Sequence, residues 1–154
     1  FGEALEKQLF SSSCLFGPLG KLFFLLLYIG GLIAASIPDY FKHGKHYHYR
    51  SLGASGAVSA VIFAAIVLIP KIPIGFIFIP VDIPGYIFGL AYLLISAFLD
   101  KKGGGNINHG AHFWGAIFGL LFTVLCISAF GKINVWENFL RQLQASQPFL
   151  PACY

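Results

Sequence analysis

The sequence predicts an all-α, polytopic membrane protein, a bundle of apolar helices that cross a bilayer. Three observations support this fold class. Of the 154 residues, 57% are hydrophobic and only 10% are charged, whereas soluble domains carry about 25% charged residues. The mean hydropathy is +0.77, and a water-soluble fold of this length could not bury so much apolar surface. The apolar residues also gather in long runs, which makes lipid the expected solvent.

Each of the long apolar runs is read as one transmembrane helix, because about 20 helical residues cross a hydrocarbon core of about 30 Å. The runs cover residues 21–37, 52–69, 84–99 and 109–130. The third run is short for a full span, so it requires an extension or a locally thin membrane. The expected organisation is a membrane domain over residues 1–131 and a short tail over residues 132–154. Within the tail, residues 135–144 form a candidate amphipathic helix.

The connections between the runs are polar, proline-rich or glycine-rich. Residues 38–51 combine basic side chains, histidines and tyrosines, and are expected to form a loop at the membrane surface. Residues 70–84 are rich in proline, which removes a helical hydrogen bond, so an interfacial loop with short extended pieces is expected. Residues 100–108 are expected to form a flexible loop. Lysine and arginine are shared equally between the two sides, so their distribution does not orient the chain.

Charge and composition argue against several kinds of site. The net charge is a modest +4 without a basic stripe, so the lipid bilayer is the expected partner and nucleic acid is not. No cofactor is expected, and the three cysteines show no disulfide or zinc spacing. His43, His46 and His48 are expected to lie in a hydrated loop and not in a metal site. His109 and His112 could form a metal-binding pair, but no third ligand is nearby, so they indicate a zinc site only weakly.

The second apolar run opens with a serine among small residues, Gly53-Ala54-Ser55-Gly56-Ala57. At a helix N-terminus the backbone N–H groups have no intrahelical partner and the helix dipole is positive. Such donors stabilise the oxyanion that forms when a serine attacks a carbonyl. The alternative is that Ser55 is only a small packing or capping residue.

The fourth apolar run carries His112 on the same helix face as two glycines. His112, Gly115 and Gly119 are separated by three and four residues. The glycines allow a neighbouring helix to approach closely, so His112 is expected to point into that seam and not at lipid. An ionisable residue inside a membrane segment is a candidate functional residue by default. The alternative is a histidine that hydrogen-bonds to a backbone carbonyl.

The two features fit together if the second and fourth helices cross through Gly56 and Gly115. Ser55 and His112 would then meet near one level of the membrane. A serine hydroxyl is a weak nucleophile until an adjacent base removes its proton. Neutral histidine is suited to that role at physiological pH. The sequence therefore predicts a Ser-His catalytic dyad.

These motifs resemble those of the rhomboid family of intramembrane serine proteases. The family has Gly-x-Ser-Gly at the start of one membrane helix and His-x-x-Gly-x-x-x-Gly on a later helix. This chain reads Gly53-Ala54-Ser55-Gly56 and later His112-Phe113-Trp114-Gly115-Ala116-Ile117-Phe118-Gly119, with one helix between the two motifs. Residues 1–7 are similar to the end of the family's second helix. The resemblance spans roughly residues 1–130.

The resemblance implies a six-helix core, of which this chain holds the last four helices. Since the sequence begins at Phe1 and contains no Met, upstream residues are expected to be missing. Ser55 would be the nucleophile and His112 the general base, and the backbone at Ser55 and Ala54 would contribute to the oxyanion hole. Substrates would be transmembrane segments of other proteins. The loop at residues 100–108 would be a flap and the third helix a lateral gate. The expected location is a bacterial inner membrane.

Two departures from the family pattern keep an alternative open. The family's second helix supplies a histidine and an asparagine to the oxyanion hole, and these positions would lie upstream of Phe1, so this chain alone is expected to be inactive. A tyrosine that usually stacks on the catalytic histidine is replaced by Ser59, so Phe63 or Trp114 is expected to hold the imidazole.

The first alternative is a catalytically dead rhomboid-like protein that binds membrane segments of client proteins. The second is a small transporter or channel subunit, which the absence of charged residues from residues 22–37, 52–69, 84–99 and 109–130 disfavours. Neither the substrate nor the oligomeric state is indicated.

Overall fold

The computed structural model describes residues 2–13, 15–43, 54–76, 79–102 and 108–146. The described helices are α1 (Gly2–Ala4), the π-helical turn η1 (Leu5–Phe10), the 3-10 turn η2 (Gly17–Leu19), α2 (Gly20–His43), α3 (Ser55–Leu68), α4 (Gly85–Lys102), α5 (His109–Phe130) and α6 (Val135–Gln144). Strands β1 (Pro73–Phe76) and β2 (Ile79–Pro84) form an antiparallel hairpin between α3 and α4. The predicted all-α membrane bundle is confirmed, and the extended pieces expected in residues 70–84 pair with each other.

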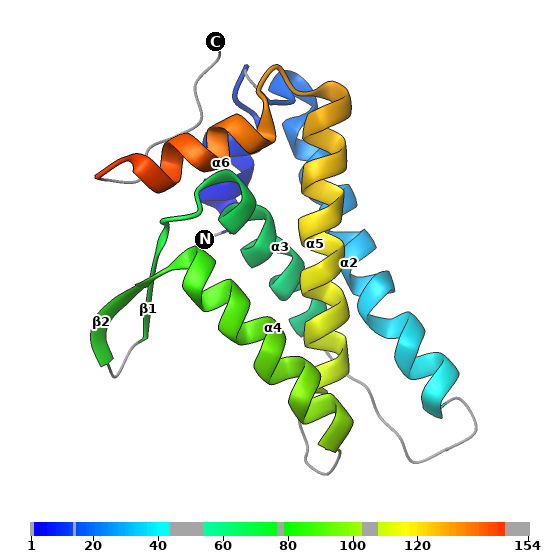
Figure 1. Cartoon of the computed structure of the whole chain (residues 1–154). Helices are drawn as coiled ribbons and strands as arrows, with labels where there is room; N and C mark the ends of the chain where they lie inside the picture. Colours follow the sequence, from blue (N-terminus) through cyan, green and yellow to red (C-terminus); the bar gives the residue numbers. More distant parts are fainter. Residues whose placement is uncertain (1, 14, 44–53, 77–78, 103–107, 147–154) are drawn as a thin grey trace.

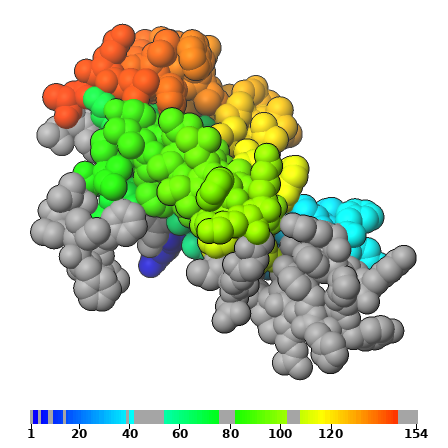
Figure 2. All heavy atoms as spheres, turned by 60° about the horizontal axis from the view of Figure 1, so that its bottom comes forward, coloured from blue at the N-terminus to red at the C-terminus, as the bar shows by residue number. Residues whose placement is uncertain are grey.

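Helix α3 is the centre of the bundle. It packs against α2 and α5, whereas α4 leans mainly on α5 and forms the outer layer over it (Figures 1 and 2). Most of α3 is buried, while α2, α4 and α5 expose large apolar side chains along their outer faces, such as Ile33, Leu94 and Leu125. This pattern is typical of helices that face lipid, and contiguous apolar surface of this extent is rare on soluble monomers.

Two segments, Gly17–Pro38 and His109–Phe130, are long and apolar enough to span a membrane. Helix α3 is equally apolar in character but has only 14 residues. A helix of that length rises about 21 Å, less than the hydrocarbon core of about 30 Å. Because α3 is buried between α2 and α5, its sides contact protein, and its length does not have to match the thickness of the hydrocarbon core.

Helix α2 is longer than predicted. A loop was expected from residue 38 onward, but the helix continues through Pro38 to His43, so that expectation is wrong for residues 38–43. Proline removes one helical hydrogen bond, and membrane helices tolerate it because nearby side chains and the remaining bonds satisfy the backbone. The Ser36 hydroxyl donates to the Leu32 carbonyl in the turn before Pro38, at 2.8 Å. Residues 44–51 of the expected loop lie outside the described residues.

The ends of the other helices also refine the prediction. Helix α3 begins at Ser55, and residues 52 and 53 of the second run lie outside the described residues. Helix α4 continues to Lys102, past residue 100 where a loop was expected. The positive charges of two lysines in its last turn stabilise the negative C-terminal end of the helix dipole. Helix α5 covers residues 109–130 as predicted, and the Asn108 side chain caps it by accepting a hydrogen bond from the Ala111 N–H at 2.9 Å.

Helix α6 lies across the end of α3 (Figure 1). The buried side chains of Asn138 and Gln142 donate to the Leu68 carbonyl at 3.0 and 3.4 Å. The opposite face, which includes Trp136 and Leu140, is exposed. These hydrogen bonds satisfy a carbonyl at the α3 C-terminus. Val135 of α6 packs against the buried core, while the Glu137–Arg141 ion pair lies on the exposed side of the helix.

Candidate active site

The candidate site is built on a close crossing of α3 and α5. A methyl group added at Gly115 would overlap the Gly56 carbonyl oxygen and lie 2.7 Å from its carbonyl carbon. One turn further along α5, a methyl group at Gly119 would lie 2.5 Å from the Cα of Ala60. Real Cβ atoms essentially never approach other atoms within 3.0 Å. The two helices therefore touch backbone to backbone, as small-residue helix contacts allow.

Ser55 and His112 lie at one end of this crossing. Ser55 precedes Gly56 and is the first residue of α3, where its side chain is exposed. His112 follows Ala111, whose carbonyl oxygen would lie 3.1 Å from a Cβ at Gly56. Each of the two side chains is thus one residue away from a direct contact between their helices. In the part of the chain that the structure describes, no hydrogen bond joins Ser55 to His112. Catalytic hydrogen bonds often tighten only when substrate is bound.

The N-terminus of α3 supplies backbone donors beside Ser55. Ala54 precedes the helix and forms no side-chain capping bond, so the first N–H groups of α3 receive no cap from it. The carbonyl of Ala54 accepts the N–H of Val58 at 2.9 Å, which closes the first turn. The N–H of Ser55 points out of the positive end of the helix, where it favours negative charge. Gly53, the first glycine of the motif, lies outside the described residues.

Among the histidines whose side chains the structure describes, His109 is the neighbour of His112. The His109 ring lies 6.1 Å from the His112 ring and nearly perpendicular to it, at 89°. Among the residues the structure describes, no group of three His, Cys, Asp or Glu side chains could hold a metal ion. The side chain of His43, and all of His46 and His48, lie outside that description.

The aromatic ring beside His112 comes from α4. It is Tyr92, not Phe63 or Trp114 as expected, and its centroid lies 6.1 Å from that of His112 with a tilt of 31°. Phe63 packs against Tyr92 instead, at 5.7 Å. Trp114 is 44% exposed, and its ring contacts that of Phe113.

The sequence carries a signal that identifies Tyr92 as an inward-facing residue. Gly85, Gly89 and Ser96 are the buried residues of α4. Their spacing of four and seven places them on one helix face, and Tyr92 occupies the gap on that face. The face marked by these small residues predicts that Tyr92 points toward the bundle. The large apolar residues of α4 do not distinguish one face of the helix from another.

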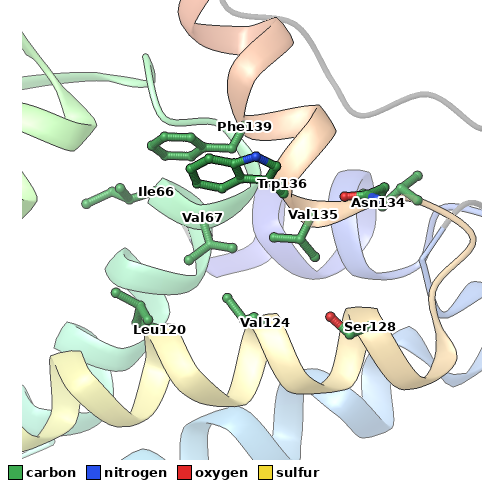
Figure 3. A pocket seen from close by; sticks show the side chains of 10 residues that line it. Ile66, Val67, Leu120, Val124, Ser128, Asn134, Val135, Trp136 and Phe139 are labelled. Carbon is green, nitrogen blue, oxygen red and sulfur yellow. The ribbon is translucent and has the colours of Figure 1, made fainter.

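A pocket of about 680 Å³ lies elsewhere in the molecule, between α3, α5 and α6. Its lining is mainly apolar, and Figure 3 shows Trp136 and Phe139 of α6 above Val67 of α3. Val67 is twelve residues beyond Ser55 on the same helix, a distance of about 18 Å along the axis. The pocket is therefore separate from the candidate active site.

Comparisons with known proteins agree on one family. A family model described as Rhomboid domain matches residues 1–129. The presenilin-associated rhomboid-like protein A, mitochondrial, of Danio rerio is 29% identical over 162 residues, which cover 91% of this chain and 37% of that protein. The chain thus spans little more than a third of that relative's length. The comparison with solved structures found no match. Because the relative is mitochondrial, the expected bacterial inner membrane is not borne out.

Proposed function

Because this chain belongs to the rhomboid family, we propose that the full-length protein is an intramembrane serine endopeptidase that uses Ser55 as nucleophile and His112 as general base. The family includes serine proteases and acts on membrane proteins within the bilayer. The observation that carries the proposal is the contact of Gly56 with Gly115 and Ala111, because it brings the helices that carry Ser55 and His112 together at their first turns.

The chemistry follows from these two side chains and the N-terminus of α3. His112 takes the proton from the Ser55 hydroxyl as its oxygen attacks the scissile carbonyl, and then returns that proton to the leaving amine. The carbonyl oxygen becomes an oxyanion, which backbone donors at Ser55 and Ala54 would stabilise. Substrates are transmembrane segments of other proteins, because the site is reached between membrane helices. Helix α4, which leans on the bundle with few contacts to α3, is the proposed route of entry.

One observation favours a second candidate, a rhomboid-like protein that binds membrane segments without cleaving them. The Ser55 and His112 side chains form no hydrogen bond with each other in the described structure. Such a protein would retain the crossing of α3 and α5 and the entry route beside α4, while lacking an activated nucleophile.

Co-expression of the full-length protein with a model transmembrane substrate separates the two candidates. The wild type and the Ser36→Ala control, whose hydroxyl bonds only within α2, are expected to cleave the substrate equally. The Ser55→Ala and His112→Ala variants are expected to leave it intact. Equal cleavage by wild type and Ser55→Ala would refute the assignment of the nucleophile. Binding of the substrate without cleavage by the wild type would favour the second candidate.

A further inference from the structure

Tyr92 joins the candidate entry helix to both helices that carry the dyad. It lies on the inward face of α4, and its ring contacts Phe63 of α3 and His112 of α5. The centroid distances of 5.7 and 6.1 Å are within the range of aromatic contacts, about 4.5–7 Å. The Tyr92 hydroxyl lies 2.6 Å from the Ser59 hydroxyl, which is buried inside the bundle. One side chain of α4 thus contacts both helices of the crossing.

The direction of the hydrogen bonds follows from the single hydrogen of a serine hydroxyl. The Ser59 hydroxyl donates to the backbone carbonyl of Ser55 at 3.0 Å. Its hydrogen is therefore engaged, so in the 2.6 Å contact the Ser59 oxygen accepts and the Tyr92 hydroxyl donates. The result is a chain of two bonds that runs from Tyr92 through Ser59 to the backbone of the residue that carries the proposed nucleophile.

We propose that Tyr92 is a positioning residue for the dyad: its ring orients the His112 imidazole, and its hydroxyl, through Ser59, fixes the first turn of α3. This inference rests on the proposed function. Ser59 occupies the position where the family usually has a tyrosine on the catalytic helix, so here the ring comes from α4. Displacement of α4 would withdraw the ring from His112 and the donor from Ser59 together, which couples substrate entry to the geometry of the dyad.

The first test measures kcat and KM for cleavage of a model transmembrane substrate by the full-length protein. Tyr92→Phe keeps the ring and loses one hydrogen bond, so kcat is expected to fall about fivefold. Tyr92→Ala also frees the imidazole, and kcat is expected to fall on the order of 10²-fold, since a misplacement of about 1 Å can have that effect. KM is not expected to rise. The matched control is Tyr86→Phe, an exposed tyrosine on the same helix, which is expected to leave both constants unchanged.

The second test moves the ring from α4 to α3. Ser59→Tyr alone is expected to be damaging, because the Tyr92 hydroxyl lies only 2.6 Å from the Ser59 oxygen. In the double variant Ser59→Tyr/Tyr92→Ala that space is vacated, and kcat is expected to recover about tenfold or more over Tyr92→Ala, since the ring is restored beside the imidazole. A purely structural role of Tyr92 would not be rescued by a ring on another helix.

Two outcomes overturn the inference while leaving the proposed function standing. In the first, Ser55→Ala is inactive but the kcat of Tyr92→Ala stays within about twofold of the wild-type value. A misplaced general base would lower kcat far more than that. In the second, the double variant Ser59→Tyr/Tyr92→Ala is folded, as shown by a melting temperature equal to that of Tyr92→Ala, but its kcat is no higher than that of Tyr92→Ala.

Thermal unfolding of Ser59→Ala, Tyr92→Phe and the combined variant supplies a readout that does not depend on proteolysis. Non-additive effects are expected for bonded neighbours, and strict additivity would refute the bond between α4 and α3. If Ser55→Ala cleaves normally, the proposed function fails, yet this cycle still tests the bond.

Discussion

Replacing Gly115 with alanine would push α3 and α5 apart at the candidate active site. The new methyl group would lie 2.7 Å from the Gly56 carbonyl carbon and 2.8 Å from its Cα. Both atoms belong to the backbone of a buried helix, so no side chain can rotate to make room. Reaching an ordinary contact of 3.4 Å with the carbonyl carbon alone requires the helices to separate by at least about 0.7 Å, and the Gly56 carbonyl oxygen, which is closer still, requires more.

Two effects of different size are expected from that separation. Overpacking of this kind destabilises a folded protein by about 1–3 kcal/mol. The dyad is more sensitive, because Ser55 and His112 are on opposite sides of the widened contact and a displacement near 1 Å can lower a rate on the order of 10²-fold. Cleavage of a transmembrane substrate should therefore fall by roughly that factor, with a smaller loss of thermal stability.

The assay measures initial cleavage rates of the full-length Gly115→Ala protein in proteoliposomes, at a temperature well below its melting point. The matched control is Gly89→Ala on α4, where the added methyl group would make only ordinary contacts of 3.4–3.6 Å with the side chains of Ile66 and Phe63. This control is expected to retain near-normal stability. A Gly115→Ala protein with the melting temperature and cleavage rate of wild type would refute the reasoning that the crossing sets the geometry of the dyad.

Three further predictions concern the helix ends. In a Trp114→Phe background, Trp136 fluorescence should be quenched by brominated lipids more strongly than by aqueous acrylamide, because Trp136 is 68% exposed and exposed tryptophans beside membrane helices favour the membrane interface; the reverse result would place Trp136 in water. Asn138→Ala should lower the free energy of unfolding by about 1–2 kcal/mol and Gln142→Ala by less, because their bonds to α3 are 3.0 and 3.4 Å long; equal, negligible effects by thermal unfolding would count against docking by these amides. Asn108→Ala should lower stability by about 1 kcal/mol through loss of the cap of α5, whereas Asn108→Asp should retain most of it.

The parts of the fold that follow from a single, local cause could be predicted from the sequence. Residues 109–130 form a helix as expected, because an apolar run is bounded by an asparagine cap and a glycine. The contact between Gly56 and Gly115 follows from the same kind of cause: glycines at helical spacing leave a groove that only another backbone can fill.

Features that depend on tertiary surroundings could not be predicted in this way. A proline normally ends a helix, yet α2 continues beyond Pro38. The amphipathic pattern of α6 predicts a helix but not its orientation, and the structure buries Asn138 and Gln142 because both meet a carbonyl at the end of α3. The inward face of α4 could be recognised from Gly85, Gly89 and Ser96, but the partners of Tyr92 could not. They depend on how α4 packs against α3 and α5.

Covalent labelling of the full-length protein tests the central claim most directly. A fluorophosphonate reagent reacts with a serine whose hydroxyl is activated by an adjacent base. Mass spectrometry of the labelled protein in membranes is expected to place the adduct on Ser55, and the His112→Ala variant is expected to remain unlabelled. An adduct on another residue, equal labelling of His112→Ala, or an unlabelled protein that still cleaves its substrate would contradict the assignment of Ser55 and His112 as a catalytic dyad.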